Sequence, residues 1–533
     1  MRIRVEMEHS PVSPTGGSGG QIARLSWMKL RQARDPAILI VATALTRFVF
    51  RSHFLYDIDS VNFALALRRF DPVVHQPHPP GYFLYVHLGM LSHALFDDPN
   101  AALVAISILA SCGAVAMIHL LASSWFGRAA ANFAGLIFVC SPVAWFHGTV
   151  ALTYIVETFF SAVTGYFCWR ASCGVRRFIL PAAAVLGIAA GFRQSSLLVL
   201  APLLLFSFRR FPPRLAVLGI GTLGLVLLAW FVPMLSASGG MSAYAASLWS
   251  LWRLVPARQS IFTSSPFTSL ARAGVIGGIY ILCFGCAATL PFGPGRNAGP
   301  TDRHIKTFTW MWLSPGLLLF TFVYLKFVNS GYLLVLLPPA CIWLGFWASD
   351  WYRKSRLPAV ARVALLGAAA AFNTAIFFRA PLYFSYREVQ RSQRELEIAV
   401  ASVRQVARPQ DTLVVGFDSH FLGYRHAGYY LPEYLTIQFP EVPLASSTGV
   451  FTMRNRDTRL TSRVDVGSDR YFVLFPLPSS DNEYREFMQH IRGRFPAGVL
   501  LVTVQNGIEI LTGPISALHV LFPHAAAGEL PAP

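Results

Sequence analysis

The stretch AALVAISILASCGAVAMIHLLAS, residues 101–123, contains no Asp, Glu, Lys or Arg and is long enough to cross a lipid bilayer as one helix. The rest of the chain has a similar character. Of its 533 residues, 54% are hydrophobic and only 13% are charged. A soluble globular protein of this length has more charged and fewer apolar residues. The sequence therefore predicts a polytopic α-helical membrane protein.

Further apolar windows approach or exceed the length of about 20 residues that a transmembrane helix needs. They lie at 36–53, 80–97, 130–149, 150–169, 178–207, 214–236, 270–292, 308–328, 330–349 and 359–379. Because adjacent windows run into one another, we expect about nine to twelve transmembrane helices in a module of residues 36–380. Residues 1–35 are polar and basic and show no signal-peptide cleavage pattern, so the first window is expected to be a retained helix.

The positive charge of the chain is distributed as in membrane proteins. The formal net charge of +18 would by itself also suit a nucleic-acid-binding protein. The basic residues, however, cluster in the tail 1–35 and in short connections at 209–214, 296–306 and 353–356. Basic loops of this kind stay in the cytoplasm. We therefore expect a cytoplasmic tail and no nucleic-acid partner, with the loops 54–80 and 237–269 and the C-terminal part outside.

Arginine greatly outnumbers lysine, which suggests a GC-rich bacterial genome. The expected location is then the inner (plasma) membrane, with the outer loops facing the periplasm or the exterior. In the outer loop 237–269, Trp249 and Trp252 lie on an amphipathic stretch. Interface anchoring is the commoner role of tryptophan in such a place, and a lid over a bound substrate is the alternative.

The window 178–207 has basic residues at both ends, although a single spanning helix cannot begin and end on the same side of the membrane. Two half-helices that meet at residues 191–196 would solve this, and they would carry Arg193 toward the outer face. Such broken helices occur where they line a cavity. The alternative is one long tilted helix with a paired or snorkelling arginine, and both interpretations stay open from the sequence.

After residue 380 the composition changes. Residues 384–402 and 481–495 are predicted helices, and 411–417, 471–476 and 499–505 are predicted buried strands. Alternating helices and strands indicate a small α/β domain over residues 384–515, outside the membrane. It contains no nucleotide-binding loop and no Cys/His metal spacing, so a role in acceptor handling or structure is expected. The Ala- and Pro-rich residues 516–533 are expected to be a frayed tail.

The outer loop 54–80 gathers polar side chains between two spans. They are Asp57, Asp59, Asn62, Asp71, His75 and His78, and Pro79-Pro80-Gly81 follows them. A helix that starts near Asp59 would place Asn62 on the same face and turn Phe63 toward lipid or core. Such a group of residues can bind a divalent cation, supply a general base for a hydroxyl, or form an ordinary solvated loop.

The order of these elements resembles a known family. DSVNFA at 59–64 and HPPGYFLY at 78–85, on either side of an outer loop, resemble the GT-C superfamily of membrane glycosyltransferases, in particular the protein O-mannosyltransferase type and its bacterial relatives. SPVAWFHGTVALTYIVETFF at 141–160 is similar to a family segment that ends in an acidic residue, here Glu157. GIAAGFRQSSLLVLAPLLL at 187–205 is similar to a Gly-rich stretch with a central basic residue, here Arg193. The resemblance covers residues 36–235.

The resemblance implies an inverting transfer of a hexose or pentose from a polyprenyl-phosphate donor to a protein, lipid or glycan acceptor on the outer face of the membrane. Asp59 would be the catalytic base, supported by the acidic Asp57 and Glu157. The donor phosphate or substrate would be bound by His75, His78 and Arg193. Ser60 follows Asp59 where relatives carry Glu, so metal dependence does not follow; a cation such as Mg²⁺ or Mn²⁺, if bound, would be held by Asp57 and Asp59.

Two other classes of protein compete with this interpretation. A multi-pass transporter would also have many spans and intramembrane charges, but it should show an internal repeat with matching broken segments, and the sequence shows none. A non-catalytic membrane scaffold would tolerate the loss of Asp59. The effect of replacing Asp59 therefore separates the enzyme from the scaffold.

Overall fold

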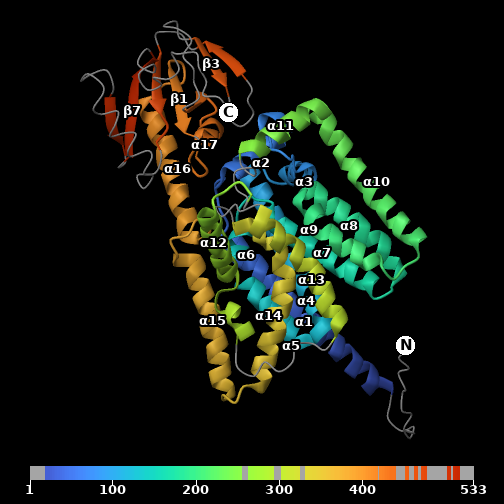
Figure 1. The fold of residues 1–533 in the computed structure, drawn as a ribbon. Coiled ribbons are helices and arrows are strands. Elements are labelled where there is room, and N and C mark those ends of the chain that lie inside the picture. Colours follow the sequence, from blue (N-terminus) through green and yellow to red (C-terminus); the bar gives the residue numbers. More distant parts are fainter. Residues whose placement is uncertain are drawn as a thin grey trace.

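The computed structural model describes residues 18–254, 262–292, 302–323, 330–417, 419–439 and 470–476, together with strand segments at 450–454, 461–465, 501–505 and 508–515. Most of the described chain forms a bundle of helices (Figure 1). A region of β-strands lies at one end of this bundle, and the N-terminal helix projects from the opposite end. The structure is therefore a helical membrane module with a small C-terminal region of mixed helices and strands.

The helices of the bundle follow the predicted apolar windows closely. The first group comprises α1 (Ser18–Val49), α2 (Ile58–Arg68), α3 (Phe83–His93), α4 (Pro99–Phe126), α5 (Arg128–Val139), α6 (Pro142–His147), α7 (Tyr154–Ser172), α8 (Ile179–Phe192) and α9 (Ser195–Phe208). The second group comprises α10 (Pro213–Ala237), α11 (Met241–Leu254), α12 (Pro266–Phe284), α13 (Arg303–Leu318), α14 (Leu337–Lys354) and α15 (Ala359–Arg379). Short 3-10 segments are η1 (Pro72–Val74), η2 (Arg176–Phe178), η4 (Gly285–Phe292) and η6 (Ser330–Leu336), and η5 (Leu319–Val323) is a π-helical turn.

Five segments among the described residues are long and apolar enough to cross a membrane. They are Pro99–Phe126, Pro213–Ala237, Pro266–Phe284, Ser330–Lys354 and Ala359–Arg379. Two shorter apolar helices, Arg128–Val139 and Ser195–Phe208, accompany them. The prediction of a polytopic membrane protein is confirmed, and the count of about nine to twelve spans stays a prediction.

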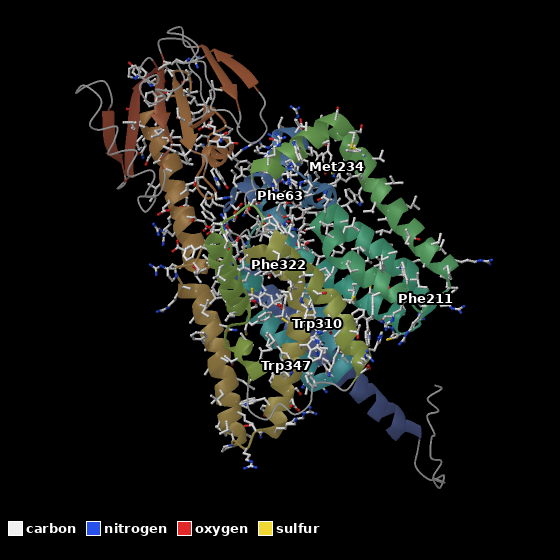
Figure 2. All side chains as sticks on the ribbon, in the orientation of Figure 1. Phe63, Phe211, Met234, Trp310, Phe322 and Trp347 are labelled. Carbon is white, nitrogen blue, oxygen red and sulfur yellow. The ribbon has the colours of Figure 1, made fainter. Side chains whose placement is uncertain are left out.

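Helix α4 lies at the centre of the bundle and packs against α1, α3, α5, α7 and α14. Its buried face carries small residues such as Ala102, Ala110, Ala114 and Ala122. Small side chains let neighbouring helices approach closely, which matters in lipid because the bilayer is as apolar as the helix surface. The aromatic side chains fill the remaining space between helices (Figure 2).

Of the two interpretations of the window 178–207, the structure has the two half-helices. Helix α8 ends at Phe192 and α9 begins at Ser195, and the two helices pack against each other. Arg193 has extended backbone at the C-terminus of α8, and its side chain is buried. Two half-helices with a charged residue at their junction thus replace one long span, as expected where such a junction faces polar groups.

The outer loop contains the predicted helix, but this helix is covered by protein. Asp57 is the N-cap of α2, and its Oδ1 accepts a hydrogen bond of 2.8 Å from the backbone N–H of Asp59. Phe63 is buried as expected, but Ser60, Asn62 and Leu67 are buried as well. An amphipathic helix resting on the membrane would leave its polar face exposed. Here the C-terminal region covers α2 instead, through α17 (Tyr424–Tyr430).

The C-terminal region joins the bundle through α16 (Tyr386–Val406), which continues from α15 toward the strands (Figure 1). Its main sheet has the order β2-β1-β5-β7-β6 and is mixed, because β1 pairs in parallel with β2 and β5, whereas β7 is antiparallel to β5 and β6. The strands are β1 (Thr412–Phe417), β2 (Leu435–Phe439), β5 (Tyr471–Leu474), β6 (Leu501–Gln505) and β7 (Ile508–Pro514). A separate antiparallel pair consists of β3 (Val450–Arg454) and β4 (Thr461–Asp465).

The observed helices and strands of the C-terminal region can be compared with those predicted from the sequence. The helix at 384–402 and the strands at 411–417, 471–476 and 499–505 are confirmed, and β5 ends at Leu474, before the predicted end at 476. Buried apolar residues of α16 pack with β1, β5 and β7 in a core of their own. The helix predicted at 481–495 and the tail predicted at 516–533 lie outside the described residues. The domain boundaries stay predictions.

Candidate active site

Asp59 and His78 meet at the end of the bundle next to the C-terminal region. Asp59 lies in the first turn of α2, and His78 comes from the turn that precedes α3. The chain between them folds back because Asp71 and Gln76 form an isolated β-bridge with two backbone hydrogen bonds. The Nδ1 atom of His78 then lies 3.2 Å from Oδ1 of Asp59. Side-chain exposures of 25% for Asp59 and 15% for His78 leave both groups accessible to a ligand.

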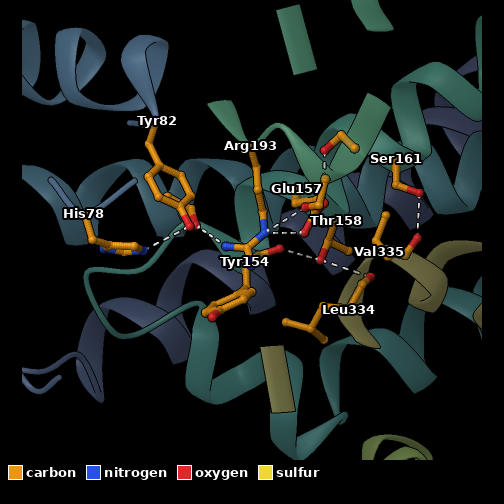
Figure 3. Close-up of polar contacts among 12 residues, drawn as sticks. His78, Tyr82, Tyr154, Glu157, Thr158, Ser161, Arg193, Leu334 and Val335 are labelled. Carbon is orange, nitrogen blue, oxygen red and sulfur yellow. Dashed lines mark hydrogen bonds and ion pairs between the residues drawn. The ribbon is translucent and has the colours of Figure 1, made fainter. Parts of the chain in front are cut away.

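The other ring nitrogen of His78 contacts Tyr82. Nε2 lies 3.1 Å from the Tyr82 hydroxyl, within hydrogen-bond distance (Figure 3). Tyr82 is the residue before α3 and has left-handed backbone with φ of 45°. A bulky residue with positive φ is uncommon and costs free energy, and such residues are concentrated at functional sites. The local backbone thus holds this phenol ring in a specific place.

Arg193 and Glu157 form a buried ion pair deeper in the same end of the bundle. Nε of Arg193 lies 3.0 Å from Oε2 of Glu157, with side-chain exposures of 5% and 1%. The Ser195 and Ser196 hydroxyls donate hydrogen bonds of 2.8 and 3.0 Å to Oε1 of Glu157. Arg193 also donates a hydrogen bond of 2.9 Å to the Thr153 hydroxyl. Buried charges need this degree of pairing, because an isolated charge in an apolar interior is very costly.

Three tyrosine rings surround the guanidinium of Arg193. Its Cζ lies 4.1 Å from the ring centre of Tyr154, 4.9 Å from that of Tyr332 and 5.7 Å from that of Tyr82. Aromatic rings attract a cation through their negative faces. Tyr82 therefore takes part in both groups, through its hydroxyl toward His78 and through its ring toward Arg193 (Figure 3).

The turn between α8 and α9 and the outer helix α11 hold the loop that carries His78. The side-chain amide of Gln194 and the hydroxyl of Tyr244 each donate a hydrogen bond of 3.1 Å to the backbone carbonyl of Pro80. Met234, which Figure 2 shows close to this end of the bundle with Phe63, is fully buried. Trp249 and Trp252 of α11 are 55% and 46% exposed, which suits interface anchoring, although α11 also covers this loop.

The C-terminal region holds the segment just before Asp59. The Tyr430 hydroxyl accepts a hydrogen bond of 2.9 Å from the Leu55 backbone N–H, and the His420 carbonyl accepts one of 2.8 Å from the Ile58 backbone N–H. Arg425 donates a hydrogen bond of 3.1 Å to the Val74 carbonyl. Residues more than three hundred positions later in the chain thus fix the backbone next to the candidate base.

Four of the six predicted site residues form two contacting pairs, and the other two, Asp57 and His75, lie beside them in the chain. The structure brings Asp59 together with His78, and Glu157 together with Arg193. Asp57 caps α2 and is 8% exposed. His75 is 4% exposed and ends η1 with left-handed backbone, in the same loop as His78. The roles assigned to these six residues stay proposals.

If a divalent cation is bound, Asp57 and Asp59 are the ligands expected from the sequence. Within the described ranges, no group of three or more His, Cys, Asp or Glu side chains is placed to hold one. One oxygen of Asp57 accepts the capping hydrogen bond of α2, so the suggested pair of Asp57 and Asp59 makes an incomplete ligand set. The described residues around Asp57 and Asp59 therefore do not fit a resident metal ion.

Several residues that contact the candidate site residues did not stand out in the sequence. They are Tyr82, Thr153, Tyr154, Gln194, Ser195, Ser196 and Tyr332. A signal was present for some of them, because Tyr82 belongs to the HPPGY element and the two serines directly follow Arg193 and Gln194. Tyr332 lies far from the other residues in sequence, and nothing local distinguishes it from an ordinary helix residue.

No protein-family model and no curated protein matches the sequence. Comparison with solved structures shows that the chain has the same fold as ArnT. The crystal structure of ArnT from Cupriavidus metallidurans bound to undecaprenyl phosphate matches with a TM-score of 0.58 and 14% identity, over 89% of this chain and 97% of that one. The apo form of the same ArnT matches with a TM-score of 0.56 and 14% identity, over 93% and 99%.

The crystal structure of the Archaeoglobus fulgidus oligosaccharyltransferase with a tethered acceptor peptide is more distant, with a TM-score of 0.46 and 13% identity, over 82% of this chain and 68% of that one. The fold expected from the resemblance is confirmed by the ArnT comparison. The likeness to the O-mannosyltransferase type in particular stays a prediction.

Proposed function

We propose that this protein is an inverting glycosyltransferase that moves a sugar from a polyprenyl-phosphate donor to an acceptor on the outer face of the membrane. The observation that carries the proposal is the pair of Asp59 and His78 at one end of a GT-C-type bundle. ArnT, which shares this fold, has been crystallised with undecaprenyl phosphate. This architecture suits a lipid-linked donor, because the lipid tail can stay in the bilayer while the sugar reaches a polar site at the end of the bundle.

In the proposed reaction, an acceptor hydroxyl or amine attacks the anomeric carbon of the donor sugar. The bond between this carbon and the phosphate oxygen breaks, and its electron pair leaves with the polyprenyl phosphate. The acceptor gives up its proton to the carboxylate of Asp59, which is 25% exposed and can therefore reach an incoming group. One displacement of this kind inverts the anomeric configuration.

The charge that develops on the departing phosphate needs stabilisation. We assign this role to Arg193, the buried cation next to Tyr82, together with His75 of the outer loop. His78 lines the same donor-binding site, but its two ring nitrogens face Asp59 and Tyr82, so it contributes no charge to the phosphate. Glu157 holds Arg193 in place through the ion pair, and Asp57 holds the first turn of α2 and thereby Asp59. Asp57 and Glu157 thus support the reaction without touching the reacting atoms.

The proposals for the membrane, the sugar and the acceptor are based on the sequence. The basic connections favour a site that faces the periplasm or exterior of a bacterial inner membrane. The sugar is proposed to be a hexose or a pentose, and the acceptor a protein, a lipid or an envelope glycan. Mass spectrometry of envelope glycans from a deletion strain, compared with the parent strain, would identify both.

Every polyprenyl-phosphate sugar donor releases free polyprenyl phosphate when its sugar is transferred. Measuring this product gives an assay that does not require the sugar to be known. We expect membrane vesicles that contain the wild-type protein to form free polyprenyl phosphate from their endogenous lipid-linked sugars, measured by mass spectrometry. Asp59→Asn should lower this rate by about a hundredfold or more, since a general base contributes about 10²–10⁴-fold.

The matched control is Asp350→Asn. Asp350 pairs with Lys354 at 2.8 Å at the far end of α14, so its loss should leave the rate unchanged. A wild-type rate with Asp59→Asn would overturn the role of Asp59 and favour the non-catalytic scaffold. Formation of no free polyprenyl phosphate by the wild-type protein, with transport of a lipid-linked sugar instead, would favour the transporter.

A further inference from the structure

Tyr82 is the residue that connects the two halves of the site. Its hydroxyl lies 3.1 Å from Nε2 of His78, and its ring centre lies 5.7 Å from Cζ of Arg193. The side chain is 5% exposed and its backbone has positive φ, so it has little freedom to turn elsewhere. Neither its hydroxyl nor its left-handed backbone has a role in the proposed transfer reaction.

The direction of the hydrogen bond between Tyr82 and His78 follows from the charge beside it. Arg193 carries only donors and cannot accept a proton from a phenol. A guanidinium also attracts the oxygen of a nearby hydroxyl and repels its hydrogen. The hydroxyl hydrogen of Tyr82 is therefore directed away from Arg193 and toward Nε2 of His78.

This direction sets the tautomer of His78. If Nε2 accepts the hydrogen of Tyr82, the proton of the neutral ring must be on Nδ1. Nδ1 is the atom that lies 3.2 Å from Oδ1 of Asp59. This contact is electrostatic and does not have the geometry of a hydrogen bond. An N–H group this close to a carboxylate still favours the charged form of that carboxylate, which is the form that a general base requires.

We propose that His78 and Tyr82 are positioning residues for Asp59: Tyr82, held by the Arg193 and Glu157 ion pair, fixes His78 in the Nδ1–H tautomer, and His78 keeps Asp59 ionised and oriented. The proposal deepens the proposed function and rests on it for the role of Asp59. The link between His78 and Tyr82 can nevertheless be tested without any substrate.

The first experiment observes His78 directly in the full-length protein in lipid nanodiscs, with ¹⁵N-labelled histidine and solid-state NMR. Because the chain has 14 histidines, the His78 signals are assigned by their loss in His78→Asn. The wild-type protein should show a protonated Nδ1 and an unprotonated Nε2. Tyr82→Phe should convert His78 to a mixture of tautomers.

The matched control for this experiment is Tyr85→Phe. Tyr85 lies three residues further on, in α3, and is fully buried. Like Tyr82 it contacts Phe63, and its hydroxyl has no hydrogen-bond partner among the described residues. Its replacement should leave the His78 signals as in the wild type. Identical His78 signals in Tyr82→Phe and wild type, or equal changes in both phenylalanine variants, would overturn the proposal.

The second experiment measures the pH dependence of polyprenyl phosphate release in vesicles. An asparagine at position 78 can place an N–H near the position of Nδ1, whereas a glutamine places it near Nε2. His78→Gln should therefore move the acid limb of the profile up by about one pH unit, while His78→Asn should keep it near the wild-type position at a reduced rate. A loss of folded protein alone would lower the rate without moving this limb.

The outcomes of these experiments separate the proposed function from the positioning role of His78 and Tyr82. If Asp59→Asn keeps the wild-type rate but Tyr82→Phe changes the His78 tautomer, the proposed function fails and the link between Tyr82 and His78 stands. If Asp59→Asn is inactive but Tyr82→Phe leaves both the tautomer and the acid limb unchanged, only the positioning role is overturned. Equal shifts of the limb in His78→Asn and His78→Gln would also overturn it.

Discussion

At the scale of single residues, the site combines an accessible pair with a buried pair. Asp59 and His78 are 25% and 15% exposed, whereas Arg193 and Glu157 are 5% and 1% exposed. The buried pair is satisfied by hydroxyl groups and aromatic rings, so its charges are well placed but costly to disturb. The accessible pair can meet a substrate. This division suits a carboxylate that reacts and a cation that acts through its field.

The buried ion pair leads to a prediction about stability. Arg193→Ala should lower the free energy of unfolding by about 3–5 kcal/mol, because it leaves Glu157 buried without its cation. The double variant Arg193→Met/Glu157→Met should recover much of this loss, since no charge then remains in the apolar interior. Thermal unfolding of the purified protein in detergent measures both.

The control for this prediction is the exposed pair of Arg404 and Glu433. Its atoms are 2.7 Å apart, but the side chains are 50% and 35% exposed. Arg404→Ala should therefore lower the free energy of unfolding by less than about 1 kcal/mol. A loss for Arg193→Ala no larger than that for Arg404→Ala would show that the buried pair contributes little.

At the scale of helices and turns, the bundle depends on close approach at small residues. Helix α7 carries Glu157 and Tyr154 on one face, and Gly165 further along packs against Trp312 of α13. A Cβ atom placed on Gly165 would lie 2.1 Å from the Trp312 ring, nearer than any real contact. The Trp312 side chain is fully buried, and its indole N–H donates to Ser161, so it has no room to move. The orientation of α7, and with it Glu157, depends on this contact.

Gly165→Ala should therefore destabilise the protein by about 1–3 kcal/mol through overpacking. Gly221→Ala is the matched control, because a Cβ on Gly221 of α10 meets nothing within 4 Å. In the middle of a helix this control change should be neutral or slightly stabilising, since alanine favours helix more than glycine. Equal melting temperatures for the two variants would contradict the packing argument.

At the scale of the whole molecule, the C-terminal region and the outer loop form one unit. Residues 419–430 contact residues 54–58 and 74 through aromatic rings and hydrogen bonds. In addition, Gln393 of α16 donates a hydrogen bond of 2.9 Å to Ser52. His426 lies at the centre of this contact and is fully buried. Burial lowers the pKa of His426 to about 4, although the nearby backbone of Leu55 and Tyr56 opposes the shift, and the neighbouring His420 adds to it.

This pKa predicts how stability depends on pH. In the unfolded chain His426 gains a proton near its ordinary pKa of about 6.5, but in the folded protein only near pH 4. Between these values the unfolded state binds more protons, so stability should rise with pH from 4 to 6.5, by up to about 3 kcal/mol from this residue. Above pH 6.5 the contribution is constant.

Thermal unfolding in detergent across this pH range measures the effect. In His426→Gln the part of the slope that belongs to this residue should disappear. His53→Asn is the control, because His53 is exposed and should leave the slope as in the wild type. An unchanged slope in His426→Gln would show that His426 is not buried in its neutral form against the outer loop.

The sequence by itself determined the membrane class, the helix at Asp59 and three of the described C-terminal strands, and it offered the broken helix at Arg193 as one of two interpretations. These features depend on local hydropathy, charge and turn chemistry, which are determined by residues close together in the sequence. Only the tertiary structure decided that Asp59 contacts His78, that Glu157 pairs with Arg193, and that Tyr82 lies between the two pairs. It also showed that α2 is covered by residues more than three hundred positions away. Contacts of this kind depend on how separate elements pack, and no local pattern encodes them.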